Sequence, residues 1–144
     1  MSGKLKVLFL CTGNSCRSQM AEGWARHLKG HVIDAYSAGI QTHGMNPHAV
    51  RVMGEAGVDL SGHRSKLVDD LPAVGFDYVV AVCDHARESC PVFPGNAVIV
   101  PRPFDDPPAL ARAETDEEAK LTHYRRVRDE IRDFVRTLPA GLTG

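Results

Sequence analysis

The segment from Lys6 to Trp24 constrains the fold of this chain more than any other part of the sequence. A short apolar run ends at Cys11, a loop of five residues follows, and Arg17 and Ser18 begin an amphipathic pattern with a helical period. This arrangement predicts a buried strand, a tight loop and a helix whose first amide groups point into the loop. Because those amides and the helix dipole favour negative charge, we expect the loop to bind an anion.

The side chains of this loop suit a tetrahedral oxyanion held against a reactive sulfur. The helix field stabilises a thiolate, so we expect Cys11 to have a lowered pKa and to act as a nucleophile. Gly13 permits a close approach of the backbone to a ligand, and Asn14 tolerates the left-handed conformation that such a loop requires. Arg17 offers two donors that match two oxygens of phosphate or arsenate, and Ser18 can donate to the thiolate. The alternative is an inert core cysteine followed by a capped helix.

The remaining chain alternates between strand and helix patterns. Strands are predicted at 5–10, 32–36, 76–83 and 97–100, helices at 18–29, 47–54 and 116–138, and a short helical or loop region at 65–71. In the helix that begins at Pro47, we expect Ala49, Val50 and Met53 to face inward. This alternation predicts a single α/β domain over residues 1–144, with a four-stranded parallel sheet and helices on both faces.

Two cysteines follow predicted strands. Ligands of such sheets bind beyond the carboxyl ends of the strands, and both Cys11 and Cys83 occur at such ends. We therefore expect both thiols to face the same crevice.

Composition narrows the classes of partner and compartment. The chain has 144 residues, a formal net charge of −1 and 43% hydrophobic residues, which gives no reason to expect binding to nucleic acid or to a membrane. The first apolar run is too short for an export signal. Without export, four cysteines are expected to be catalytic or metal-binding rather than structural disulfides. We therefore expect a cytoplasmic protein.

The stretch Cys11-Thr-Gly-Asn-Ser-Cys-Arg-Ser18 resembles the phosphate-binding loop of the low-molecular-weight protein tyrosine phosphatase family. Further matches make the chain most similar to the thioredoxin-coupled arsenate reductases built on that fold. They lie at Gln19–Trp24, Tyr36–Ile40 and Thr42–Gly44, and the resemblance reaches the C-terminal helix. The resemblance implies the phosphatase-like fold and an oxyanion-binding loop around Cys11 and Arg17. Its members here are Thr12, Gly13, Asn14, Ser15, Cys16 and Ser18, of which Cys16 has no required role in the family.

The segment from Cys83 to Cys90 distinguishes a reductase from a phosphatase. A phosphatase needs one nucleophile and a proton donor, whereas a reductase must return two electrons to its nucleophile, which thiol–disulfide exchange can do. The resemblance implies that Cys11 attacks arsenate, that Cys83 attacks the sulfur–arsenic adduct and releases arsenite, and that Cys90 then forms a disulfide with Cys83. Thioredoxin would reduce that disulfide, and no metal or other cofactor is expected.

Two alternatives remain for these cysteines. Cys83 can be an inert core thiol and Cys90 an incidental surface residue, or both can bind zinc with His85, although the spacing is not the short pairing typical of zinc sites. If the pair forms a disulfide, the Cα atoms must lie within about 7 Å. A regular helix would separate them by about 10 Å, so we expect this segment to loop out on oxidation.

The pair Asp105-Asp106 before Pro107 supplies candidates for the proton donor. The acid of the family directly precedes a proline, so Asp106 is the predicted donor and Asp105 the alternative; a simple turn also fits this pattern. Phosphatases of this fold place aromatic walls after that proline. Here Pro108, Ala109 and Leu110 follow instead, which favours a small inorganic substrate such as arsenate, with phosphate or sulfate as competitors.

Three further positions are implied to support the loop. Asn14, Glu22 and Ser37 match residues that steady it in the family and that bind potassium in some members, together with an aspartate. In this chain Lys66 follows His63-Arg-Ser65 instead. An ammonium group cannot ligate a cation but can replace one electrostatically, so we expect little potassium dependence.

Three functions compete on the sequence. The favoured one is arsenate reduction. The second is hydrolysis of phosphotyrosine or small phosphoesters by Cys11, Arg17 and Asp106, and the third is a non-catalytic oxyanion or redox sensor.

Overall fold

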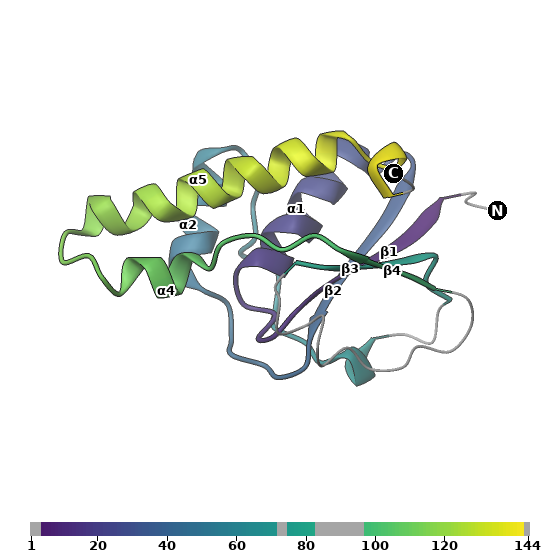
Figure 1. Ribbon diagram of the computed structural model, residues 1–144, viewed down its shortest axis with the longest axis horizontal. Coiled ribbons are helices and arrows are strands. Elements are labelled where there is room, and N and C mark those ends of the chain that lie inside the picture. The colour runs from purple at the N-terminus through teal and green to yellow at the C-terminus, as the bar shows by residue number, and fades with distance from the viewer. Residues whose placement is uncertain (1–3, 72–74, 83–96, 143–144) are drawn as a thin grey trace.

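The computed structural model describes residues 4–71, 75–82 and 97–142. A parallel sheet of four strands lies at its centre in the order β2-β1-β3-β4 (Figure 1). The strands are β1 (Leu5–Cys11), β2 (Ile33–Gly39), β3 (Tyr78–Ala81) and β4 (Val98–Pro101). All three pairs of neighbours are parallel. The predicted parallel sheet is confirmed.

The topology places the end of β1 at the ligand-binding edge of the sheet. β1 lies between β2 and β3, and Val7, Leu8, Phe9 and Leu10 are fully buried, as expected for a strand covered on both faces. The chain crosses from β1 to β2 on one side, and β3 lies on the other side of β1. The strand order therefore reverses at β1, and the crevice beyond the carboxyl end of such a strand is the usual binding site.

Helices cover the sheet. They are α1 (Arg17–Lys29), α2 (Pro47–Glu55), α4 (Pro107–Ala111) and α5 (Glu117–Arg136), with short 3₁₀ helices η1 (Val68–Asp70) and η2 (Ala140–Leu142). α1 packs on β1 and β2, and α5 packs on α1, α2 and α4. η1 lies on the opposite side of the sheet from α1 and α5 (Figure 1). This arrangement is the predicted α/β class.

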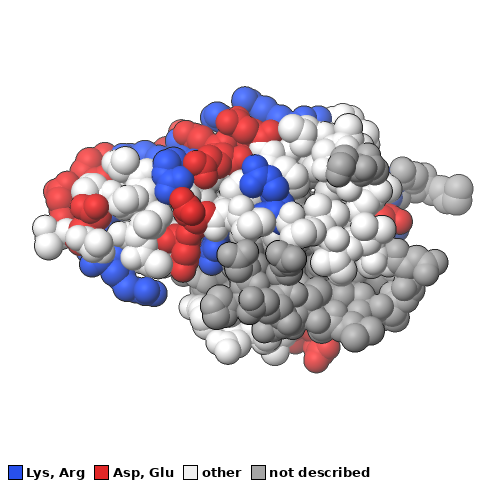
Figure 2. Space-filling view, viewed as in Figure 1, with Lys and Arg blue, Asp and Glu red and all other residues white. Residues whose placement is uncertain are grey.

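The long C-terminal helix buries one apolar stripe and exposes its charges. Its buried residues follow the helical period: Leu121, Tyr124, Val127, Ile131, Phe134 and Val135. On the other face, positive and negative side chains are interspersed (Figure 2). Arg125, for example, pairs with Glu55 at 2.9 Å. Within the described residues, no helix is both long enough and apolar enough to span a bilayer.

Several element boundaries differ from the prediction. β2 continues to Gly39 because its pairing with β1 extends to the end of that strand. In α2 the inward valine is Val52, which is fully buried, and not Val50, because positions 49, 52 and 53 share one helical face. β3 begins at Tyr78, and its predicted end at residue 83 lies outside the described residues.

One helix was not predicted. α4 begins at Pro107, directly after the acidic pair, where the sequence indicated only a proline-rich loop. Proline is favoured in the first turn of a helix because its missing amide hydrogen costs nothing there, so a signal was present.

Candidate active site

The loop between β1 and α1 is held from outside through its carbonyl groups. The carbonyls of Thr12, Gly13 and Ser15 accept hydrogen bonds from residues 40–46 and from Ser65. The bonds are Ile40 N and Gln41 N to Thr12 O at 3.0 and 2.9 Å, His43 N and Ser65 Oγ to Gly13 O at 3.1 and 2.8 Å, and Asn46 N to Ser15 O at 3.1 Å. The loop is thereby fixed by segments that follow it in sequence.

These outward carbonyls orient the amide groups. In a planar trans peptide, the N–H points away from the carbonyl of the same unit. Outward carbonyls at Thr12, Gly13 and Ser15 therefore turn the N–H groups of the next residues inward, toward the cavity. That cavity has a volume of about 530 Å³ and lies at the carboxyl end of β1. Its lining comprises Cys11, Thr12, Gly13, Ser15, Cys16, Arg17, His43, Phe104, Asp105, Asp106, Pro108 and Arg112.

Asn14 has the left-handed conformation that the sequence predicts, with φ of +47°. Its side chain is buried and fully bonded: Nδ2 donates to Ser18 Oγ at 2.9 Å, and Oδ1 accepts from Gln19 Nε2 at 2.9 Å and from the backbone N–H of Lys66 at 2.7 Å. These bonds compensate for a conformation that costs a non-glycine residue free energy. Ser18 accepts from Asn14 and so keeps its own hydroxyl hydrogen free to donate.

Two glycines allow the close packing around the loop. A Cβ atom at Gly13 would lie 2.3 Å from His43 Nδ1, and one at Gly39 would lie 2.8 Å from both Asn14 N and Thr12 O. Sequence reasoning predicted the close approach at Gly13 but gave no role to Gly39 or His43. Both belong to segments that resemble the family, which is the signal that could have found them.

The structure separates the two candidate acids. Arg17 donates to the carbonyl of Phe104 at 2.9 Å, and its guanidinium lies 3.7 Å from the carboxylate of Asp106. Asp105 turns instead toward α5, where its carboxylate pairs with Arg126 at 3.0 Å. Both aspartates line the cavity, but Asp106 faces the arginine of the loop. The geometry therefore supports Asp106 over Asp105.

The second cysteine of the loop is buried beside the first. Burial raises the pKa of the Cys16 thiol well above its ordinary value, against the opposing effect of the Arg17 charge. A thiol held in its protonated form is a poor nucleophile, so Cys16 lines the site without the properties of an attacking group.

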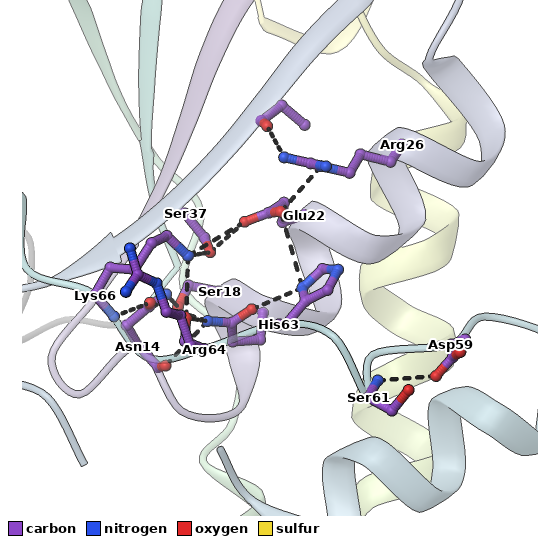
Figure 3. Close-up of polar contacts among 12 residues, drawn as sticks. Asn14, Ser18, Glu22, Arg26, Ser37, Asp59, Ser61, His63, Arg64 and Lys66 are labelled. Carbon is purple, nitrogen blue, oxygen red and sulfur yellow. Dashed lines mark hydrogen bonds and ion pairs between the residues drawn. The ribbon is translucent and has the colours of Figure 1, made fainter. Parts of the chain in front are cut away.

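Behind the loop, a buried carboxylate collects three basic side chains (Figure 3). Ser37 Oγ donates to Glu22 at 2.6 Å, and Arg26 Nε lies 3.0 Å from the same carboxylate. Lys66 Nζ and His63 Nδ1 each lie 3.8 Å from it, on opposite sides of Glu22 in Figure 3. We call these five residues the Glu22 cluster. A buried carboxylate is stable only when it is paired and hydrogen-bonded in this way.

Lys66 joins the Glu22 cluster to the loop. Its N–H donates to Asn14, its carbonyl accepts from the N–H of Gly39 at 2.8 Å, and its ammonium also donates to the carbonyl of Arg64 at 3.1 Å. Burial lowers the pKa of Lys66, while the nearby Glu22 carboxylate acts to raise it. The three supports predicted from the sequence, Glu22, Ser37 and Lys66, are therefore in contact with one another.

The predicted relay cysteines Cys83 and Cys90, and His85 of the zinc alternative, lie outside the described residues. The last described residue before them is Val82, whose N–H donates to the carbonyl of Leu10 at 3.0 Å. Val82 thus lies beside β1, next to the residue that precedes Cys11. In the described ranges, no group of three or more His, Cys, Asp or Glu side chains is arranged to hold a metal ion.

Comparisons with known proteins agree with this fold and loop. The family of low molecular weight phosphotyrosine protein phosphatases matches residues 6–143. An arsenate reductase of Halalkalibacterium halodurans is 48% identical over 134 residues, or 93% of this chain and 94% of that protein.

Solved structures of two activities have the same fold. An arsenate reductase in the oxidized state superposes with a TM-score of 0.74 at 30% identity, over 94% of this chain and 96% of its own. A low molecular weight protein tyrosine phosphatase from T. tengcongensis superposes with a TM-score of 0.70 at 30% identity, over 94% and 97%. With a buried cysteine at the end of β1 inside a ring of inward amides, this chain belongs to the low molecular weight phosphotyrosine protein phosphatase family.

Proposed function

We propose that this protein is an arsenate reductase that releases arsenite through a relay of Cys11, Cys83 and Cys90. The observation that carries the proposal is the position of Val82 beside Leu10. It brings the backbone that leads into Cys83 to the strand end that bears Cys11. The similarity to arsenate reductases over nearly the whole chain supports the same activity.

In the first step, the Cys11 thiolate attacks the arsenic of arsenate. The inward amides and the Arg17 guanidinium hold the oxygens and stabilise their negative charge, the usual source of catalysis at an oxyanion site. One oxygen leaves as water after Asp106 donates a proton to it. A sulfur–arsenic(V) bond replaces the bond to that oxygen.

In the second step, the Cys83 thiolate attacks the sulfur of Cys11. The sulfur–arsenic bond breaks, its electron pair passes to arsenic, and arsenite leaves with arsenic reduced by two electrons. The two electrons come from the two cysteines, which are oxidised to a disulfide. Cys90 then attacks Cys83, which frees Cys11 and leaves a Cys83–Cys90 disulfide.

We further infer that thioredoxin reduces this last disulfide. An internal pair of cysteines makes a small thiol unnecessary in the arsenic adduct, and a dithiol protein can reduce the pair by exchange. Such a cycle requires a reducing compartment, so we place the protein in the cytoplasm, where it would serve arsenic detoxification.

Hydrolysis of aryl phosphates is the second candidate function. It is favoured by the contact of Arg17 with Asp106, because the same nucleophile, oxyanion loop and acid suffice for a phosphatase. The rim argues against a large aromatic substrate, since α4 places Pro108, Ala109 and Leu110 where phosphatases of this fold have aromatic walls. We infer at most residual phosphatase activity.

Replacement of the relay cysteines tests the proposal. Arsenate reduction is measured as NADPH oxidation coupled through thioredoxin and thioredoxin reductase. Cys83→Ser is expected to release no arsenite but to keep its hydrolysis of an aryl phosphate. Cys90→Ser is expected to release about one equivalent and then stop, because Cys11 remains in a disulfide. Reduction by Cys83→Ser at the wild-type rate would refute the relay, and a single equivalent from the wild type would indicate a sensor.

A further inference from the structure

A second arginine lies on the solvent side of the catalytic cavity. Arg112 follows α4 directly and lines the cavity with Cys11 and Arg17. The side chain of Arg17 is only 13% exposed, whereas Arg112 is exposed to solvent. A ligand that enters the cavity therefore meets Arg112 before it reaches the loop.

The charge of Arg112 is not neutralised by a neighbouring carboxylate. The other ionic groups of the cavity have partners: Arg17 lies near Asp106, and Asp105 pairs with Arg126. For Arg112, no carboxylate of the described ranges comes within ion-pair distance. Its guanidinium is thus available to an incoming anion, with a fork of donors that suits two oxygens.

In-line attack determines which oxygen lies near the cavity entrance. The leaving oxygen lies opposite the attacking atom, so it points away from Cys11 and toward solvent. In a free oxyanion such as arsenate or inorganic phosphate, this oxygen can accept a hydrogen bond from a cation. In a phosphate ester it carries the organic group, which needs the same space as the arginine side chain.

We propose that Arg112 selects free inorganic oxyanions over phosphate esters by binding the oxygen opposite the attacking sulfur. This inference deepens the proposed function, since it assigns the substrate preference of that site to a named residue. Two guanidinium groups, Arg17 at the loop and Arg112 at the entrance, then share the charge of the dianion.

The test compares Arg112→Gln and Arg112→Lys with Arg51→Gln. Arg51 is an exposed arginine on α2, weakly paired with Glu55 at 3.9 Å, so its loss lowers the net charge equally. Calorimetry gives the Kd of inorganic phosphate, and kinetics give the KM of arsenate and of 4-nitrophenyl phosphate. All are measured at 0.15 M ionic strength, where the Debye length of about 8 Å suppresses long-range attraction.

We expect Arg112→Gln to weaken phosphate and arsenate by the same factor, about fivefold to thirtyfold, as for a lost charge-assisted hydrogen bond. The KM of the ester should stay within about twofold or fall, Arg112→Lys should recover part of the loss, and Arg51→Gln should match the wild type.

Three results would overturn the inference: unchanged affinity for phosphate, equal weakening of phosphate and ester, or a change confined to the KM of thioredoxin. The last would make Arg112 a contact for the reductant protein. Binding of phosphate requires no turnover, so the inference is tested even if the wild-type protein fails to reduce arsenate.

Discussion

Lys66 contacts the buried Glu22 carboxylate through its ammonium, 3.8 Å away, and holds Asn14 of the oxyanion loop through its backbone N–H at 2.7 Å. One residue therefore carries a positive charge into the Glu22 cluster and fixes the one loop residue with a left-handed backbone. A cation that is part of the chain cannot dissociate. The charge that balances Glu22 is thus present at any salt composition.

Potassium is accordingly expected to have little effect on this protein. Arsenate reduction should be equal in potassium and sodium chloride at the same ionic strength. Lys66→Met keeps the length of the side chain but removes its charge, so Glu22 loses one of its counter-charges. We expect this variant to lose about 1–3 kcal/mol of unfolding free energy, as for an uncompensated buried group.

Urea denaturation and steady-state kinetics check this prediction. The control is Lys4→Met, since Lys4 forms an exposed pair with Asp34 at 3.9 Å and should change stability by less than about 1 kcal/mol. A large activation of the wild type by potassium over sodium would contradict the assigned role of Lys66.

The adjacent aspartates should differ sharply in their effect on turnover. Asp106→Asn removes the acid that faces Arg17, and we expect kcat to fall by about 10²–10⁴-fold. Asp105→Asn removes only an exposed pair with Arg126, so activity should stay within about threefold of wild type. Hydrolysis of phenyl phosphate and 4-nitrophenyl phosphate distinguishes loss of acid catalysis from misfolding. The loss in Asp106→Asn must be larger for phenyl phosphate, which has the poorer leaving group. Equal losses in the two variants would remove Asp106 from the mechanism.

His63 should make stability depend on pH. Burial lowers the pKa of His63 below the ordinary value of 6.5, opposed by the nearby Glu22 and reinforced by the charges of Arg26 and Lys66. The unfolded chain then binds a proton more readily than the folded one. Stability is therefore fully present above about pH 6.5 and is lost as pH falls toward the folded pKa.

The urea midpoint of the wild type is expected to fall between about pH 6.5 and pH 5. The fall should be smaller in His63→Gln, which keeps a polar group near Gln19 but does not titrate. Asp59 also faces His63, so Asp59→Asn serves as the control for charge outside the Glu22 cluster. An identical pH profile in the wild type and in His63→Gln would exclude this histidine as the titrating group.

Much of the fold follows from patterns that are local in the sequence. The apolar run before Cys11 and the helical stripe from Leu121 to Phe134 each concern residues that are neighbours within one element. Periodicity reports such burial directly. The left-handed backbone of Asn14 was predictable for the same reason, because it depends on the residue's own side chain and on its immediate loop.

The details of the site depend on contacts between distant segments. The sequence by itself determined that a thiol, an arginine and an anion-binding loop occur together, since all lie within one strand–loop–helix unit. Only the tertiary structure decided that Asp106 and not Asp105 faces Arg17, that Arg112 reaches the same cavity, and that Lys66 meets Glu22. Adjacent residues of the same type have the same local propensities, and their roles differ only through what the folded chain packs against each of them.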